Sequence, residues 1–399
     1  MTLPLPLAEA QSRLLQAVEP LGAETVAADE AVGRYLAEPL IAARTQPAAD
    51  LSAMDGYAVR ADDLAGPWRV VGESAAGHPF AGKVGPGEAV RISTRALMPA
   101  GECAVLLQEN AARENDTLSL NGEGEPTPRH IRRAGFDFHA GDRLLDAGSR
   151  IGPAQLALAI AGGHRELRVG TLPSLAILDS GDELAADPTK CALHQIPASN
   201  GAMLATMAAP LVREVRRTGP VPDRMDVFLD VLAHCSDVDV IVTSGGASVG
   251  DHDLVRPALE EWGATIDFWR VALKPGKPLL VARRGAQWIV GLPGNPVSSY
   301  VTAFLFLLPL LRRLGRAAEP LPRPLTMHLG TALPPVGDRT EFVRARLDGG
   351  QLVPVAEQDS SALAALAAAQ ALIERPAGAP AAAAGELARA FWLGNGGMA

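Results

Sequence analysis

The chain has 399 residues, of which 48% are hydrophobic and 20% are charged, a balance typical of a folded globular protein. A chain of this length is expected to form about two to four domains rather than a single core. Its formal net charge of −9 argues against a nucleic-acid-binding protein, because such proteins normally carry a basic excess, and we predict no nucleic-acid partner.

The cysteines and the apolar runs narrow the class of protein further. Cys103, Cys191 and Cys235 form no CxxC pair, so the sequence predicts neither a zinc ribbon nor a disulfide framework, and free thiols favour the cytoplasm. The most apolar run, residues 301–311, is interrupted by Pro309. Because a membrane span needs about 20 apolar residues, we expect a buried helix here and no membrane contact.

The N-terminal part of the chain combines helical and β-prone segments. Apolar residues at helical spacing predict an amphipathic helix over residues 5–19, and a second short helix is expected around 28–37. From about residue 42 to 134, short β-prone runs alternate with Gly, Pro and Asp, which indicates a β-rich domain. Residues 152–163 return to a helical pattern. The β-prone runs lie at 68–71, 89–93 and 104–108.

Residues 174–314 alternate strand-like and helix-like segments, which is typical of a mostly parallel α/β sheet. Ser199 is expected to cap one helix, whose apolar face extends to Val215. Asn295 is expected to cap a second helix, with Pro296 in its first position. The predicted strands lie at 174–179, immediately before 223, and at 238–243, 265–273, 278–283 and 287–291.

Beyond residue 319 the chain becomes rich in proline and then strand-like, which predicts a small β-rich C-terminal domain. The Ala-rich segment 362–385 fits either this domain or a helix on its surface. The strand-like runs lie at 324–330, 341–347 and 351–355.

The segment Val240–Asp253, VIVTSGGASVGDHD, ends a predicted strand in a glycine-rich loop. Ligands of an open α/β sheet bind at the carboxyl ends of its strands, where glycines let backbone N–H groups approach a phosphate. A plain tight turn is the alternative, but three hydroxyls favour an anion site, and the pattern is neither a Walker loop nor GxGxxG. The candidate binding residues are Thr243, Ser244, Gly245, Gly246, Ser248 and Gly250.

Two further loops at predicted strand ends are candidate anion-binding sites. Lys274–Pro278, KPGKP, fixes two lysines between prolines, and we expect it to lie near the glycine loop in the same sheet. Gly291–Ser299, GLPGNPVSS, leads into a helix whose N-terminal N–H groups favour an anion. The alternatives are a solvated basic turn and simple helix capping. The candidate residues are Lys274, Lys277, Pro293, Gly294, Asn295 and Ser298.

Carboxylates also follow the predicted strands. The motif Asp179–Glu183, DSGDE, offers acidic groups for a hard cation such as Mg²⁺, and Asp223 and Asp253 stand at other strand ends. This pattern suits a metal that bridges phosphate or oxyanion groups, although an acidic helix N-terminus is the alternative for DSGDE. In the β-rich region, MDGYAV, residues 54–59, contains an Asp-Gly pair. Taken alone, this pair predicts a structural turn and no functional role.

Taken in order, MDGYAV, SGDEL, TSGGASVGDHD, LKPGKP and GLPGNPVSS resemble the motifs of the molybdopterin molybdenumtransferase family, which includes the gephyrin E domain. The resemblance spans about residues 5–395. It implies a multidomain α/β protein that forms a homodimer and contacts the molybdopterin adenylyltransferase. The implied domains are a helical one from 1–41 and 135–170, an inserted β-rich one at 42–134, a mostly parallel α/β molybdopterin-binding one at 171–316 and a β-barrel-like one at 317–399.

The resemblance also implies a reaction and its residues. Adenylylated molybdopterin binds with Mg²⁺, molybdate promotes cleavage of the phosphoanhydride, AMP leaves, and molybdenum stays on the dithiolene. The implied site lies between the α/β domain of one subunit and the inserted domain of the other. Glu183, Asp223 and Asp253 match metal-handling positions, while Ser180, Gly181, Asp182 and Ser360 match binding positions. The implied catalytic residues are Asp55, Thr94, Asp137, Glu183, Asp223, Asp253, Lys274 and Lys277.

Several positions depart from the common family pattern. Arg95 stands where a glycine is common, Phe136 where a glutamate is common, and Ala198 where an aspartate is common. Ser180 and Asp359 stand where a threonine and a glycine are common. Arg95 and Ala198 favour an alternative hypothesis, a catalytically impaired pterin-binding paralogue that acts as a carrier or scaffold. A third hypothesis is the related adenylyltransferase, but the large flanking domains argue against it.

Overall fold

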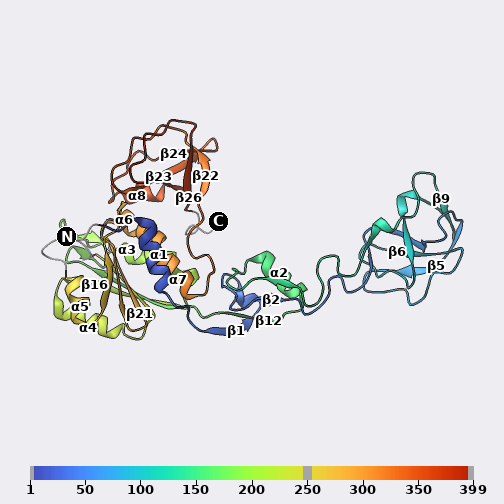
Figure 1. The fold of residues 1–399 in the computed structure, drawn as a ribbon, viewed down its shortest axis with the longest axis horizontal. Helices are drawn as coiled ribbons and strands as arrows, with labels where there is room; N and C mark the ends of the chain where they lie inside the picture. Colours follow the sequence, from blue (N-terminus) through green and yellow to red (C-terminus); the bar gives the residue numbers. More distant parts are fainter. Residues whose placement is uncertain (1–3, 246–253, 394–399) are drawn as a thin grey trace.

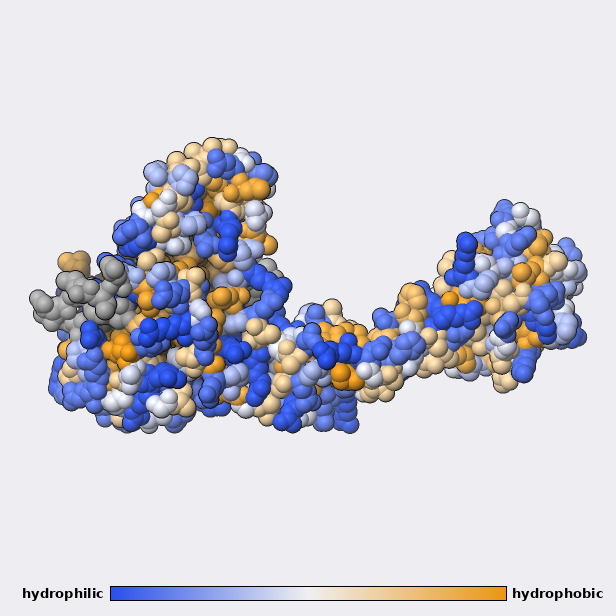
Figure 2. All heavy atoms as spheres, viewed as in Figure 1, coloured by the Kyte–Doolittle hydropathy of each residue, from blue (hydrophilic) through white to orange (hydrophobic). Residues whose placement is uncertain are grey.

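The computed structural model describes residues 4–245 and 254–393. Figure 1 shows an elongated molecule with an α/β domain (174–314) at one end and a β-rich domain (51–132) at the other. A thin connecting region (23–41 and 143–170) joins them, and the C-terminal domain (325–392) stands on the α/β domain. An open gap separates the C-terminal domain from the β-rich domain in the space-filling view (Figure 2).

The β-rich domain contains a six-stranded sheet and a short strand pair. Trp68, which is 1% exposed, packs with Val59 and Leu106 in its core, and all three predicted β-prone runs are confirmed as strands. The elements are β3 (Leu51–Ser52), β4 (Gly56–Arg60), β5 (Trp68–Ser74), β6 (Glu88–Ile92), β7 (Cys103–Leu107), a 3₁₀ turn at Gln108–Asn110, β8 (Ala111–Glu114), β9 (Thr117–Leu120), a 3₁₀ turn at Pro128–His130, and β10 (Ile131–Arg132). The sheet order is β7-β4-β6-β5-β9-β8, and β3 pairs with β10.

The connecting region is built from strand pairs and one helix. β1 (Ala23–Ala27) pairs with β12 (Glu166–Gly170), β2 (Leu40–Ile41) pairs with β11 (Arg143–Leu145), and the predicted helix at 152–163 is confirmed as α2 (Pro153–Ala161). The helix predicted around 28–37 is wrong beyond a 3₁₀ turn at Asp29–Ala31, because Gly33 has a φ of 88° and Tyr35 and Leu36 then form β-bridges to Arg150 and Val169.

The α/β domain is a six-stranded sheet in the order β16-β13-β17-β21-β20-β18. The first four strands run parallel to one another, and β20 runs antiparallel to both of its neighbours, β21 and β18, so the expectation of a mostly parallel sheet is confirmed. The strands are β13 (Ser174–Ser180), β16 (Glu214–Val221), β17 (Val240–Ser244), β18 (Thr265–Trp269), β20 (Leu280–Arg284) and β21 (Gln287–Leu292). The helices of this domain are α3 (Asn200–Ala208), α4 (Met225–His234), α5 (Val255–Glu261), α6 (Pro296–Thr302) and α7 (Leu308–Leu314).

Both faces of this sheet are buried, as a doubly covered parallel sheet requires. Along β13, Leu175 and Ile177 enter one apolar core, while Ala176 and Leu178 enter the other. The first core also receives the N-terminal helix α1 (Leu7–Ala17), which buries Leu14 there and confirms the amphipathic helix predicted for residues 5–19.

Three local expectations in the α/β domain need correction. The helix expected to reach Val215 ends at Ala208, because Pro210 lacks an N–H and the chain turns into β16. The strand expected at 265–273 breaks into β18 and a separate β19 (Leu273–Lys274). Ser199 and Asn295 occupy the predicted N-cap positions, but neither side chain makes a capping hydrogen bond.

The apolar run at 301–311 lies in a continuous helical stretch, Pro296–Leu314, whose most apolar window is 89% buried. Its middle, Ala303–Leu307, is π-helical, which accommodates the missing N–H of Pro309 at the start of α7. This stretch is the one helix of membrane-spanning length within the described ranges, and it is a core helix of the α/β domain, as predicted.

The C-terminal domain is a sheet in the order β19-β23-β25-β26-β22, with β24 beside β23. Its first strand, β19, ends at Lys274, the first residue of KPGKP. The strand that leads into this motif therefore does not belong to the α/β sheet as expected, whereas β20, which follows the motif, does. The Ala-rich segment forms one short helix and then a strand. The elements are β22 (Leu325–His328), β23 (Thr340–Asp348), β24 (Gln351–Pro354), α8 (Leu363–Ala367), β25 (Ala371–Arg375) and β26 (Leu387–Trp392).

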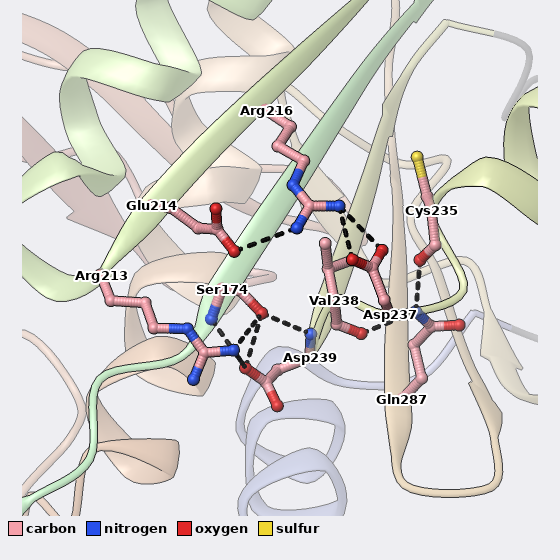
Figure 3. Close-up of polar contacts among 9 residues, drawn as sticks. All are labelled: Ser174, Arg213, Glu214, Arg216, Cys235, Asp237, Val238, Asp239 and Gln287. Carbon is pink, nitrogen blue, oxygen red and sulfur yellow. Dashed lines mark hydrogen bonds and ion pairs between the residues drawn. The ribbon is translucent and has the colours of Figure 1, made fainter.

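Polar contacts tie together the amino ends of the α/β strands (Figure 3). Asp239 accepts hydrogen bonds from the Ser174 N–H and hydroxyl, both at 2.7 Å, which links the start of β13 to the start of β17. Arg216 donates to both oxygens of Asp237, at 2.8 and 2.7 Å. The Gln287 amide donates to the carbonyls of Cys235 and Val238 at 2.8 and 2.7 Å. This edge of the sheet is therefore occupied by the protein's own contacts.

Candidate functional site

A cleft of ≈ 1050 Å³ opens between the carboxyl edge of the α/β sheet and the C-terminal domain. The two domains are joined on both sides of it. β19 pairs with β23 on one side, and Ser360 contacts α6 on the other. Nine residues predicted from the sequence line this one cleft: Glu183, Gly245, Lys274, Lys277, Pro293, Gly294, Asn295, Ser298 and Ser360.

Three cationic side chains line the cleft, those of Lys274, Lys277 and Arg339. The Lys274 ammonium lies 3.1 Å from a carboxylate oxygen of Glu341, its register partner on β23. Because the Lys274 side chain is 55% exposed, this ion pair is screened by water and contributes little to stability. Lys274 can therefore exchange Glu341 for an anionic ligand at small cost.

Several buried polar atoms at the carboxyl ends of β13 and β17 have no hydrogen-bond partner among the described residues. They are Asp179 Oδ1, Ser180 Oγ and Thr243 Oγ1. The other carboxylate oxygen of Asp179 accepts the Gly201 N–H at 3.1 Å, and burial raises the pKa of this carboxyl. Because buried polar groups are normally paired, these atoms mark the edge of the sheet where hydrogen-bonding capacity remains for a ligand.

The first turn of α3 holds this edge to the GLPGN loop. The Asn200 amide donates to Ser244 Oγ at 3.0 Å and to the Gly294 carbonyl at 2.6 Å. Gly245 follows with a φ of 102°, a conformation that favours glycine. Gly245, the first glycine of the predicted loop, lines the cleft, whereas Gly246, Ser248 and Gly250 lie outside the described residues.

The GLPGN loop is held from the C-terminal domain. The Asn295 amide donates to Ser360 Oγ at 2.8 Å, and the Val297 N–H donates to the Ser360 carbonyl at 3.1 Å. Asn295 therefore bridges two domains, in place of the capping role expected from the sequence. Ser298 is buried in the first turn of α6.

Only some of the acidic residues predicted to bind a metal are in contact in the structure. The Asp182 N–H donates to Asp223 Oδ2 at 3.4 Å, and the Asp223 N–H donates to Asp182 Oδ1 at 3.2 Å, so these two loops lie together. Glu183 lines the cleft, and Gly181 before it has a φ of 147°. In the part of the chain that the structure describes, no three His, Cys, Asp or Glu side chains form a metal-binding group, and Asp253 lies outside it.

A second group of predicted residues lies in the β-rich domain. Asp55 Oδ1 accepts the Thr94 N–H at 2.6 Å and the Thr94 hydroxyl at 3.1 Å, and these hydrogen bonds lower the pKa of Asp55. Gly56 is required beside it, because a Cβ there would collide with the Leu106 carbonyl of β7. In Figure 1 this domain lies at the far end of the molecule from the cleft, so one chain alone does not bring the two groups together.

The structure shows the local environments of Arg95, Phe136 and Ala198, three of the positions that depart from the common family pattern. Arg95 has a φ of 68°, in the left-handed region that favours glycine, which explains why a glycine suits this position. Phe136 is 74% exposed and precedes the exposed Asp137, between the β-rich domain and the connecting region. The Ala198 N–H donates to the Ala185 carbonyl at 3.0 Å, where β14 (Leu184–Ala185) pairs with β15 (Ile196–Pro197).

The structure adds cleft residues that the sequence did not reveal. Arg339, Glu341 and Gln358 line the wall supplied by the C-terminal domain. Arg339 immediately precedes β23, and Glu341 is the second residue of that strand. Charged residues at alternate positions are also typical of the solvent-exposed face of an ordinary strand. No glycine or proline motif marks them, and only the pairing of β19 with β23 brings them to the lysines.

Comparisons with known proteins cover almost the whole chain. The family described as "MoeA N-terminal region (domain I and II)" matches residues 5–163, "Probable molybdopterin binding domain" matches 176–313, and "MoeA C-terminal region (domain IV)" matches 326–390. A molybdopterin molybdenumtransferase of Haemophilus influenzae is 36% identical over 315 residues, 78% of either chain. One of Staphylococcus aureus is 30% identical over 387 residues, 94% of this chain and 92% of the relative.

Solved structures agree with the sequence matches. A molybdopterin biosynthesis moeA protein from Pyrococcus horikoshii OT3 superposes with a TM-score of 0.83 at 25% identity, covering 97% of this chain and 99% of that one. A second structure of such a protein from this organism gives 0.76 at 28% identity, with 97% and 98% covered. Since relatives and structures match along nearly the full length, the chain belongs to the molybdopterin molybdenumtransferase family of molybdenum cofactor biosynthesis.

Proposed function

We propose that the protein transfers molybdenum from molybdate to adenylylated molybdopterin and releases AMP. The observation that carries this proposal is the single cleft that the KPGKP lysines, Gly245 and the GLPGN loop line together. A pterin nucleotide is large, polar and anionic. The cleft offers volume and cations, and unpartnered hydroxyls lie buried at the adjoining carboxyl ends of β13 and β17.

In this proposal the lysines act on the phosphoanhydride. Lys274 and Lys277 would offset the charge that develops on the phosphate as AMP leaves, with Arg339 beside them. The hydroxyls of Ser180 and Thr243 would donate to the pterin or its phosphate, which would satisfy groups that are otherwise buried without a partner.

A divalent cation such as Mg²⁺ fits the donor set, because Glu183, Asp223 and the neighbouring Asp182 offer the carboxylate oxygens that it prefers. Glu183 and Asp223 would hold it, together with Asp253, which lies outside the described residues. When bound, the cation supplies Lewis-acid stabilisation of phosphate and oxyanion charge.

We further propose that the active form is a homodimer in which Asp55 and Thr94 complete the cleft of the partner. The support is spatial, since the β-rich domain lies far from the cleft of its own chain. In a twofold dimer, each β-rich domain can reach the other subunit's cleft, and two equivalent sites result.

AMP release tests the reaction. The purified protein is incubated with adenylylated molybdopterin and Mg²⁺, with and without molybdate. We expect release that depends on molybdate and that is lost in Lys274→Ala. Tight pterin binding without molybdate-dependent release would instead support the carrier hypothesis, which the departures at Arg95 and Ala198 favour.

Mixing two inactive variants tests the shared site. If Asp55→Ala and Lys277→Ala chains exchange in a mixture, half of the dimers are hybrids, and each hybrid holds one intact cleft. Activity should then return to about a quarter of the wild-type level. A mixture that stays inactive although the subunits exchange would refute the shared site.

A further inference from the structure

Arg344 on β23 is a charged side chain in the interior of the C-terminal domain. It is 1% exposed. Its guanidinium donates to three backbone carbonyls, those of Glu357 at 3.1 Å, Asp359 at 2.9 Å and Ala362 at 3.2 Å. All three acceptors lie in the loop 357–362, between β24 and α8.

No carboxylate accepts a hydrogen bond from Arg344 among its described contacts. Burial lowers the pKa of Arg344, and the nearby carboxylates of Glu357 and Asp359 oppose this shift. The carbonyl dipoles of the loop and these two charges, which the loop also carries, offset the cost of burying the guanidinium. Gln358 adds to this arrangement, because its side chain accepts the Arg344 N–H at 3.0 Å and donates to the Arg344 carbonyl at 2.9 Å.

Apart from the Gln358 contacts with the Arg344 backbone, the other hydrogen bonds of the loop within this domain are local ones, such as those from the Asp359 N–H to Glu357 and from the Ser361 N–H to Asp359. The side chains of Glu357, Gln358, Asp359 and Ser361 are exposed, so apolar packing does not fix their backbone. This loop nevertheless carries Ser360, which accepts the hydrogen bonds of Asn295 and Val297 across the domain boundary. It also supplies Gln358, Asp359 and Ser360 to the wall of the cleft.

We propose that Arg344 is a positioning residue for substrate binding. Its three carbonyl contacts hold the loop 357–362, the loop holds Ser360 on the first turn of α6, and this contact fixes the wall of the cleft opposite KPGKP. Arg344 does not line the cleft, while its neighbours Glu341 to Val343 do. The role in substrate binding rests on the proposed molybdenumtransferase activity, but the role in loop order does not.

The test uses the full-length chain with Arg344→Lys, since lysine keeps the charge but lacks the planar fork that reaches several carbonyls. Hydrogen–deuterium exchange at 357–362 and at the Val297 amide reads the loop without substrate. We expect exchange there to rise about tenfold, because the hydrogen bonds that protect these amides open more often. Unchanged exchange would overturn the proposal.

The second arm measures AMP release. We expect the KM for adenylylated molybdopterin to rise about tenfold while kcat stays within about twofold, the pattern of lost ground-state binding. The matched control is Leu329→Ala, which weakens the core of the same domain at a fully buried residue that does not line the cleft. An equal rise in KM in this control would mean that general destabilisation, not loop position, causes the effect.

Ser360→Ala tests the contact between the loop and α6 directly, because it removes the hydrogen bond from Asn295 and leaves the core of the domain intact. If Arg344 acts through Ser360, the two substitutions together should raise KM by less than the product of their separate effects. Multiplicative effects would contradict the proposed chain of contacts. If wild-type protein releases no AMP, the proposed activity fails, and the exchange experiment still decides the loop role.

Discussion

The two edges of the α/β sheet are built from the same strands, yet their polar groups differ in how they are satisfied. At the amino edge, Ser174 and Asp239 are paired with each other, and the Gln287 amide donates to two carbonyls, although its own oxygen lacks a partner. At the carboxyl edge, Ser180 and Thr243 are buried with hydroxyls that have no partner among the described residues. The amino edge contributes stability, and the carboxyl edge retains binding capacity at some cost in stability.

The largest effect is expected at the carboxyl edge, for Lys277→Ala. If Lys277 faces the cleaved phosphate as we propose, removal of its charge should lower the rate of AMP release about 100-fold, which corresponds to about 3 kcal/mol. Lys277 is exposed, so the thermal unfolding temperature should stay within about a degree. Lys83→Ala in the β-rich domain is the control, and a similar loss of rate there would remove the case for KPGKP.

The next effect is expected at the amino edge, for Asp239→Ala. This change leaves the buried Ser174 N–H without its acceptor and should lower the free energy of unfolding by about 2 kcal/mol, measured by urea denaturation. The rate of AMP release per folded molecule should not change. The control Asp237→Ala removes an exposed ion pair with Arg216 and should lower the free energy of unfolding much less. Equal losses in both variants would contradict the division between the two edges.

A smaller effect of opposite sign is expected for Thr243→Val. The valine keeps the shape of the side chain and removes a hydroxyl that is 0% exposed and unpaired, so the free energy of unfolding should rise by about 1 kcal/mol. Pterin nucleotide binding should weaken in the same variant. Thr302→Val is the comparison, because the Thr302 hydroxyl donates to the Ser298 and Ser299 carbonyls and its loss should destabilise the fold.

Asp179→Asn should give the smallest change, and one that depends on pH. Burial raises the pKa of Asp179 against the opposing influence of Arg217 and the Gly201 N–H, so the stability that the protonated carboxyl provides is lost as pH rises through that pKa. Asparagine cannot ionise and can still accept from Gly201. The difference in unfolding free energy, variant minus wild type, should therefore grow as the pH is raised from about 4. A constant difference would show that Asp179 does not titrate in this way.

The parts of the site that rest on short-range patterns were predictable from the sequence. A buried strand that ends in glycine and hydroxyl residues, such as Val240–Ser244, places its loop at the carboxyl edge whatever the rest of the fold does. The lysines of KPGKP were expected near that loop and do line the same cleft. The roles of these residues in catalysis stay predictions.

The errors came from long-range pairing and backbone detail. β19 belongs to the C-terminal sheet because it pairs with β23, whose paired residues lie 67 residues further along the chain. A strand of two residues contains no sequence pattern that predicts this pairing. The expected helix around 28–37 is displaced by bridges from Tyr35 and Leu36 to Arg150 and Val169, distant residues that local propensity does not register. Arg344 was missed because a lone arginine in a strand pattern looks solvated until its burial is known.

The strand β19 also limits how this chain can be divided. A fragment that ended at residue 316 would keep Lys274 and Lys277 but lose β23, the strand that β19 pairs with in the intact protein. Exchanging the C-terminal domain with that of a relative would likewise replace Glu341 and Ser360 together, and with them two side-chain contacts across the boundary. Phe391 of that domain also packs against Phe304 in the core of the α/β domain. The α/β and C-terminal parts therefore form one structural unit, and gene fusions or chimaeras should be joined in the connecting region instead.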